Sequence, residues 1–86
     1  MTQKTFKIYT EDKEKTWIKE LLSNTFSGCT ILYALGLWRG KEENALCIEI
    51  ITHNKSLVKE VSQKIKRHNQ QATVLYTEIQ TEVNSV

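Results

Sequence analysis

The stretch TILYALGLWRG, residues 30–40, is apolar at both its odd and its even positions. Successive side chains of a β-strand point to opposite faces of the sheet, so both faces of this strand need an apolar covering. The chain has 86 residues, and a chain of that length buries only ~60–65% of the surface that it exposes when unfolded. We therefore expect its own helices to cover one sheet face and a ligand or a second copy to cover the other.

The stretch is expected to form one arm of a hairpin. Residues 29–39 and 44–53 are two β-rich runs, and the polar segment GKEE separates them. A short polar loop opened by Gly40 between two such runs indicates an antiparallel hairpin. A loop centred near residues 41–43 would place Leu37 opposite Cys47, Leu35 opposite Glu49 and Tyr33 opposite Ile51.

This register assigns each side chain to a face. The helix-covered face would hold Leu32, Ala34, Gly36, Trp38, Leu46, Ile48 and Ile50. The open face would hold Tyr33, Leu35, Leu37, Arg39, Cys47, Glu49, Ile51 and His53. A slip of one residue would exchange the faces of a strand, because its side chains alternate strictly.

The flanking segments complete a βαββαβ order. Residues 4–10 alternate as a half-buried strand, and residues 11–26 carry one apolar helical stripe that ends at Ser27–Gly28. A second amphipathic helix begins near Ser56, a candidate N-cap, and residues 72–83 form the last strand. This order predicts one α+β, ferredoxin-like domain over residues 1–86, with residues 83–86 frayed. We expect a four-stranded antiparallel sheet with two helices on one face, in which the first and last strands flank the central hairpin.

Composition and charge narrow the functional classes. The net charge is only +2, and the basic excess lies in KSLVKEVSQKIKRHN, residues 55–69, which is either a solvated helix face or an anion-binding edge.

The N-terminus has no signal-peptide pattern, and no apolar run approaches the ~20 residues that span a bilayer. We therefore expect a cytoplasmic protein without a membrane partner. Cys29 and Cys47 lack metal-ligand spacing and are interpreted as reduced core residues.

Catalytic and metal chemistry find little support in the sequence. Glu49 and His53 are weak candidates for an acid–base role. The structural alternative for Glu49 is an ion pair with Arg39 or Lys7. The alternative for His53 is a role in a turn or a helix cap. Neither His53 nor His68 has a metal ligand at helical spacing, and no cofactor motif is present, so neither a metal nor a cofactor is expected. Nucleic acid is disfavoured as a partner, because the strand ALCIEIITH, residues 45–53, lacks the aromatic residues of RNA-recognition modules.

A ligand-binding interpretation rests on residues that can stack on a ring or hold an anion. In GLWRG, residues 36–40, Trp38 can stack on a planar group and Arg39 can offer paired donors to a phosphate or carboxylate. The alternative is a core tryptophan between two structural glycines, with Arg39 at the sheet edge. The candidate ligand-binding residues are Tyr33, Trp38, Arg39, Lys41, Arg67 and Tyr76.

Residues 29–76, with the strand ending GLWRG and the later NQQATVLY, resemble an uncharacterised bacterial and phage family of small α+β proteins. That family has a G-x-W-x-G strand end and a last strand preceded by QQ, and its function is unknown, so the resemblance supports the fold only. More distantly, the element order resembles PII-like ferredoxin-like oligomers, which hold nucleotides or metabolites between subunits.

These observations predict a non-enzymatic homo-oligomer, a dimer or trimer, that binds a small anionic ligand such as a nucleotide between subunits. It would act as a regulatory protein or as a phage protein that sequesters nucleotides. One alternative is an enzyme of the dimeric α+β-barrel kind that uses Glu49 or His53 as its acid–base group. The other is a protein-interaction or inhibitor module that docks through the open sheet face.

Overall fold

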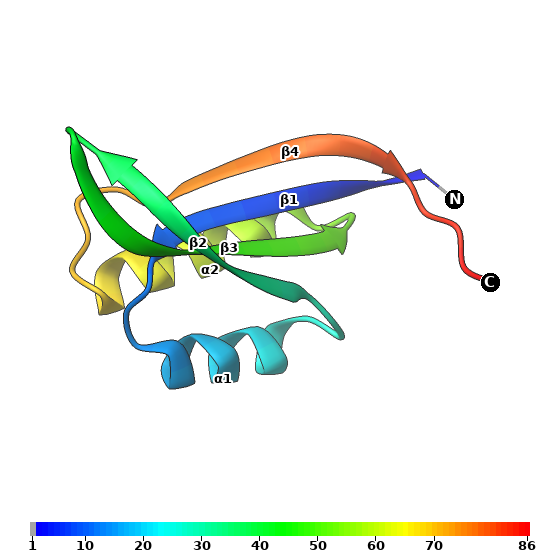
Figure 1. The fold of residues 1–86 in the computed structure, drawn as a ribbon. Coiled ribbons are helices and arrows are strands. Elements are labelled where there is room, and N and C mark those ends of the chain that lie inside the picture. The colour runs from blue at the N-terminus through cyan, green and yellow to red at the C-terminus, as the bar shows by residue number, and fades with distance from the viewer. Residues whose placement is uncertain (1) are drawn as a thin grey trace.

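The computed structural model describes residues 2–86, which form six elements in the predicted βαββαβ order. They are β1 (Thr2–Glu11), α1 (Lys15–Thr25), β2 (Thr30–Trp38), β3 (Lys41–Thr52), α2 (Lys55–His68) and β4 (Leu75–Glu82). The strands form one antiparallel sheet, and both helices lie against one of its faces (Figure 1). The predicted ferredoxin-like fold is confirmed. Within residues 2–86, neither helix is long and apolar enough to cross a lipid bilayer.

The strand order is β2-β3-β1-β4. The expectation that β1 and β4 flank a central β2–β3 hairpin was therefore wrong, since β1 and β3 occupy the centre and β2 and β4 form the edges. Burial follows this arrangement: β1 buries Phe6 and Ile8 completely and β3 buries Ile48 completely, whereas no side chain of β2 or β4 is fully buried. The helices therefore cover the centre of the sheet best and leave the edge strands more exposed.

The hairpin turn is tighter than predicted. Trp38 lies opposite Lys41, so Arg39 and Gly40 alone make the turn, and both have positive φ, 51° and 77°. Positive φ at both central residues is the mark of a type I′ turn, whose twist matches that of the flanking strands. The polar segment that was expected to be a loop therefore continues β3. Tyr33 pairs with Leu46 and not with Ile51, a shift of five residues.

Because five is an odd number, the shift reverses the faces of β2 and leaves those of β3 as predicted. Leu46, Ile48 and Ile50 are buried against the helices, as expected. On β2, however, the helix side holds Ile31, Tyr33, Leu35 and Leu37, and the open side holds Leu32, Ala34, Gly36 and Trp38. The predicted burial of Leu32 and Trp38 under the helices was wrong for this reason.

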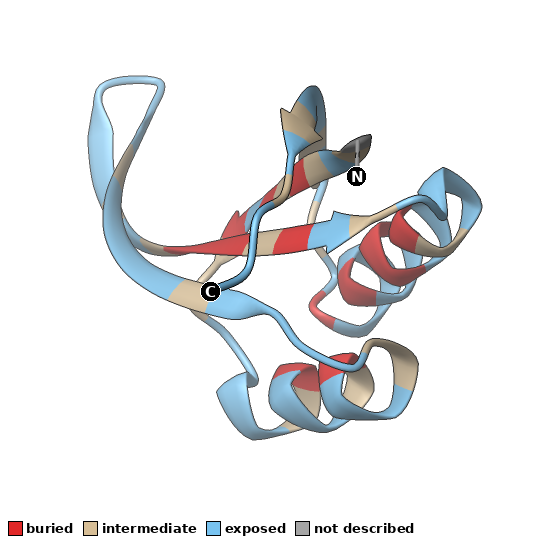
Figure 2. Cartoon of the chain, turned by 90° about the vertical axis from the view of Figure 1, so that its right-hand side faces the viewer, coloured by how far each residue is buried: buried red, intermediate tan, exposed pale blue. Residues whose placement is uncertain are grey.

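The core lies between the sheet and the two helices, where the buried residues face each other (Figure 2). The predicted apolar stripes are confirmed, since Ile18 and Leu22 of α1 and Val58, Val61 and Ile65 of α2 are buried. The helices also meet through a stacked pair of rings, with the centroids of Trp17 and His68 3.7 Å apart and the planes within 2°.

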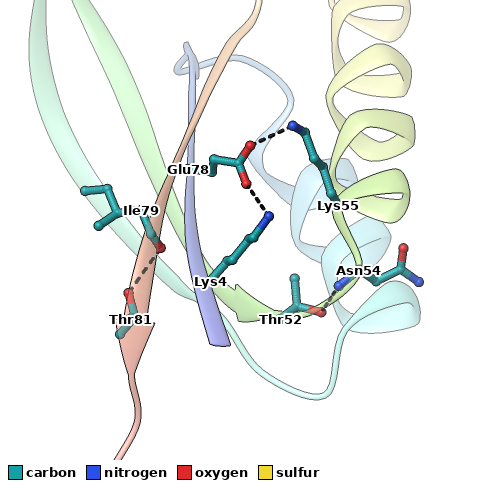
Figure 3. Close-up of polar contacts among 7 residues, drawn as sticks. All are labelled: Lys4, Thr52, Asn54, Lys55, Glu78, Ile79 and Thr81. Atoms are coloured by element: carbon teal, nitrogen blue, oxygen red, sulfur yellow. Dashed lines mark hydrogen bonds and ion pairs between the residues drawn. The ribbon is translucent and has the colours of Figure 1, made fainter. Parts of the chain in front are cut away.

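The start of α2 is held by side chains from three elements (Figure 3). The N-cap is Asn54, whose Oδ1 accepts a hydrogen bond from the backbone N–H of Leu57 at 3.1 Å, and not Ser56 as predicted, which lies inside the helix. Glu78 of β4 pairs with Lys55 of α2 at 2.6 Å and with Lys4 of β1 at 3.0 Å. The hydrogen bond from Lys55, followed by that from Lys4, lowers the pKa of Glu78 below its ordinary value.

Candidate functional site

The sheet face turned away from the helices, which we call the open face, carries ordered rows of side chains. It consists of the odd-numbered residues of β1, β3 and β4 and the even-numbered residues of β2. One row crosses all four strands: Leu32, Cys47, Tyr9 and Leu75. We call it the apolar row. Leu32, Tyr9 and Leu75 are 43–58% exposed, so a continuous apolar band lies open on this face.

The next row along the open face is polar. It contains one residue from each strand, in the order Thr30, Glu49, Lys7 and Thr77. The Nζ of Lys7 lies 3.7 Å from Oε1 of Glu49, and each side chain is about a third exposed. The predicted pairing of Glu49 with Lys7 is confirmed, whereas Arg39 lies at the hairpin turn. The two charges cancel, so the centre of the open face is neutral.

A cleft of about 330 Å³ lies between the β2–β3 hairpin, β1 and the segment that leads into β4. The hairpin bends away from the helices (Figure 1). Its open-face residues Ala34, Gly36 and Trp38 line the cleft. The small residues Ala34, Gly36 and Ala45 leave room between Trp38 near the tip and Tyr9 of the apolar row. The lining is mostly apolar and has an aromatic side chain on either side, which suits a planar ligand.

The charges that line the cleft are acidic. Only Glu11 and Glu43 among the described lining residues are ionisable at neutral pH. The carboxylate of Glu11 is paired with Lys13 at 2.9 Å, whereas the side chain of Glu43 has no ion pair or hydrogen bond within residues 2–86. A bare phosphate would be repelled here. The nearest cations along the hairpin are Arg39 and Lys41, at its tip.

Arg39 adopts an unusual backbone conformation. Its φ is 51°, in the left-handed region that costs an ordinary L-residue about 1–2 kcal/mol. Its guanidinium carbon lies 5.6 Å from the centre of the Trp38 ring, within the range of a cation–π contact. The turn therefore places a charged, planar donor group over Trp38, which lines the cleft, at the expense of backbone strain.

A buried hydrogen-bond network holds the far wall of the cleft. Gln71 Oε1 accepts from the hydroxyl of Thr10 at 2.6 Å and from the side-chain amide of Asn69 at 3.1 Å. Thr10 and Asn69 are both buried. Because Gln71 also lines the cleft, the network ties one wall of the cleft, the loop after α2, to β1.

The structure brings together only some of the predicted ligand-binding residues. Trp38, Arg39 and Lys41 lie at the hairpin tip. Tyr33 lies on the helix side, where the Nζ of Lys15 is 5.0 Å from its ring centre, and Tyr76 packs against the core. Arg67 is in the last turn of α2. The six residues therefore do not form one site within a protomer.

The cleft contains residues that the sequence interpretation passed over. Tyr9, Glu43, Cys47 and Leu75 all line it. The dipeptide Arg39–Gly40 between two β-rich runs was the signal that could have located them, since a two-residue turn there fixes the register. That register places Glu43 and Trp38 on one face, and the separate pairing of β1 with β3 sets Tyr9 beside Cys47.

The weak catalytic candidates lie apart from the cleft. Glu49 is in the polar row, and His53 follows β3 at the opposite end of the sheet, beside a depression of about 210 Å³ that it shares with Gln3, Lys4 and Gln80. In the described part of the chain, no group of three or more His, Cys, Asp or Glu side chains could hold a metal ion.

The two cysteines occupy different environments. Both are free thiols. Cys47 is buried as predicted, and its burial raises the pKa of its thiol, which the charge of Lys7 lowers by less. Cys29 was predicted to be a core residue, but it is exposed because it lies in the connection before β2 begins at Thr30.

Comparison with solved structures places this architecture among known folds. No protein-family model and no curated protein matches the chain by sequence. It is similar to CPII, a nitrogen regulatory PII-like protein from Thiomonas intermedia K12 bound to ADP, AMP and bicarbonate, with a TM-score of 0.66, 19% identity, and 99% of this chain and 98% of that chain covered. It is also similar to a DUF3240 family protein from Shewanella baltica OS155, with a TM-score of 0.72, 15% identity, and 100% and 97% of the two chains covered.

A third similar structure is that of a phage SAM lyase in its apo state, with a TM-score of 0.67, 13% identity, and 92% of this chain and 81% of that chain covered. At these identities the likeness concerns the fold. The predicted resemblance to PII-like proteins and to an uncharacterised family is confirmed at that level.

Proposed function

We propose that the protein is a homo-oligomer that binds a nucleotide-like ligand between subunits and acts without catalysing a reaction on it. The observation that carries this proposal is the cleft beside Trp38, which adjoins the exposed apolar row on the same sheet face. A ligand in the cleft and a second copy on the row would cover neighbouring parts of one surface.

Exposed apolar area supports self-association. Besides the apolar row, Ile51 and Ile79 of the open face are 50% and 59% exposed. These two side chains lie beyond the polar row, so the open face exposes two separate apolar strips, more apolar surface than a monomeric protein usually leaves in water. The Lys7–Glu49 pair adds a positive and a negative charge side by side, so two copies could set each charge against its opposite. We propose a dimer or trimer assembled through this face.

The charge distribution suggests how the ligand is oriented. A planar ring fits the mostly apolar cleft, and the carboxylates of Glu11 and Glu43 would keep phosphate groups out of it. The phosphates would therefore lie at the mouth, near Arg39 and Lys41. The strained backbone of Arg39 supports a role for its side chain, because a residue that accepts positive φ more readily would make a better turn.

The similar structures support a nucleotide in particular. CPII, which shares the fold over almost its whole length, is bound to ADP and AMP. We extend this ligand class to the present chain and propose a regulatory role for binding; sequestration of nucleotides on behalf of a phage is the narrower form of the same proposal. Of the predicted contacts we retain Trp38, Arg39 and Lys41. Tyr76 packs against the core, and Tyr33 is exposed on the helix side of β2.

Thermal shift with the full chain tests ligand binding. GTP, GDP, GMP, ATP, ADP and AMP are each added in excess, and at 100 times Kd a bound ligand stabilises the native state by about 2.7 kcal/mol. Arg39→Ala should weaken this effect strongly. Arg67→Ala is the matched control, because it removes the same charge from α2. If no phosphate compound stabilises the wild-type chain, the proposed function is wrong.

A further inference from the structure

Of the two carboxylates among the described residues that line the cleft, Glu11 has an ion pair with Lys13 but Glu43 has none. We propose that Glu43 selects the base of the ligand, and that this base is guanine. The inference rests on the proposed function for the ligand class and adds the identity of the ring. It follows from where Glu43 stands, from what surrounds it and from the hydrogen bonds that a carboxylate can accept.

Glu43 stands inside the cleft because of its place on β3. It lies opposite Gly36 on the open face, and its Cγ is 3.6 Å from the position that a Cβ of Gly36 would occupy. The missing side chain therefore leaves room for the glutamate beside the cleft lining. Trp38 and Ala45 are its neighbours on the same face, so a ring seated beside Trp38 comes within reach of the carboxylate.

A ligand that covers this carboxylate must also satisfy it. The side chain of Glu43 has no hydrogen bond or ion pair within residues 2–86, and the residue is half-buried. The other carboxylate of the cleft, that of Glu11, already has Lys13 at 2.9 Å. A stacked ring would remove water from Glu43. Covering an ionised group without giving it hydrogen-bond partners is strongly unfavourable. The ligand itself must therefore bring the donors.

The carboxylate also specifies the pattern of those donors. An ionised carboxylate only accepts hydrogen bonds and prefers two parallel donors. Guanine presents its N1–H and its 2-amino group side by side. Adenine and cytosine each place a ring acceptor beside their amino group, and uracil places carbonyl oxygens on both sides of its N–H. Those acceptors would face the negative charge, so guanine alone among the common bases matches Glu43.

The rest of the cleft fits this orientation. Tyr9 and Trp38 both line it, and aromatic side chains stack on any base, so they add affinity without discriminating. Selectivity then falls to Glu43. Arg39 at the tip stands over Trp38, where it can meet phosphates that lead away from the stacked ring.

The experiment is isothermal titration of the full chain with GDP and with ADP, which carry identical phosphates. GDP should bind about 10- to 100-fold more tightly, the range that a bidentate base contact contributes. Glu43→Gln replaces one acceptor by a donor and should reverse the preference, since a glutamine amide pairs with adenine. Glu42→Gln is the matched control, because Glu42 precedes it on the same strand but points to the other face.

A second measurement needs no variant. IDP lacks the 2-amino group of guanine, so it should bind the wild-type chain more weakly than GDP does. Equal affinity for GDP and ADP, equal affinity for IDP and GDP, or an unchanged preference in Glu43→Gln would each overturn the inference and leave the proposed function standing. Absence of binding by every nucleotide overturns both.

Discussion

Arg39 holds a backbone conformation that few arginines adopt. With φ at 51° in the first position of a type I′ turn, it occupies a site where asparagine is strongly preferred. Arg39→Asn should raise the free energy of unfolding by about 0.5–1 kcal/mol, because asparagine enters the left-handed region at lower cost. The same change should weaken nucleotide binding. Urea unfolding and titration calorimetry measure the two effects, and an Arg39→Asn chain that is less stable would contradict the account of the turn.

Glu78 connects stability to pH through its two lysines. Its folded-state pKa is lowered, so its ion pairs stabilise the protein above the ordinary value of 4.5 and are lost as the pH falls through the lowered pKa. Glu78→Gln should lower Tm slightly at neutral pH, and the difference from wild type should vanish in acid. Melting curves between pH 7 and pH 3 measure it. A difference that stays constant over this whole range, with no decrease below pH 4.5, would show that Glu78 acts by packing and not by charge.

At the scale of elements, the start of α2 offers a direct comparison. Asn54→Ala removes the hydrogen bond to the N–H of Leu57 and should reduce the free energy of unfolding by about 1 kcal/mol. Ser56→Ala should change it little, since Ser56 lies within the helix. Denaturant titration of both variants decides between the two caps. An equal loss in both would contradict the assignment of Asn54.

The elements themselves could be predicted because each carries its own periodicity. The helical spacing of Val58, Val61 and Ile65 predicts a buried helix face from the local sequence alone. Register between strands could not be obtained in this way, because β2 is apolar on both faces and its pattern fits either orientation. Only the turn decides the register, and the polar residues after Gly40 suggested a longer loop. The wrong register also hid the cleft, because it put Trp38 under the helices and Glu43 in the loop. The turn at Arg39 and Gly40 brings them to the same face of the sheet.

For the whole molecule, the open face determines the state of assembly. Leu32→Glu places a charge in the apolar row and should convert the proposed oligomer into a single chain of 10.0 kDa without unfolding it. Leu37→Glu is the control, because Leu37 lies on the same strand but on the other face. Light scattering after gel filtration measures the mass. A wild-type chain that is monomeric at high concentration would favour a module that docks on a different macromolecule.

The chain contains two tryptophans, and their positions make the protein its own fluorescent reporter. Trp17 is stacked on His68 where α1 meets α2, so its emission follows the integrity of the helical layer. Trp38 is 55% exposed and lines the cleft, so its emission responds to what enters there. Replacing one indole at a time by phenylalanine separates the two signals, and occupancy and unfolding can then be recorded optically from a single unlabelled sample.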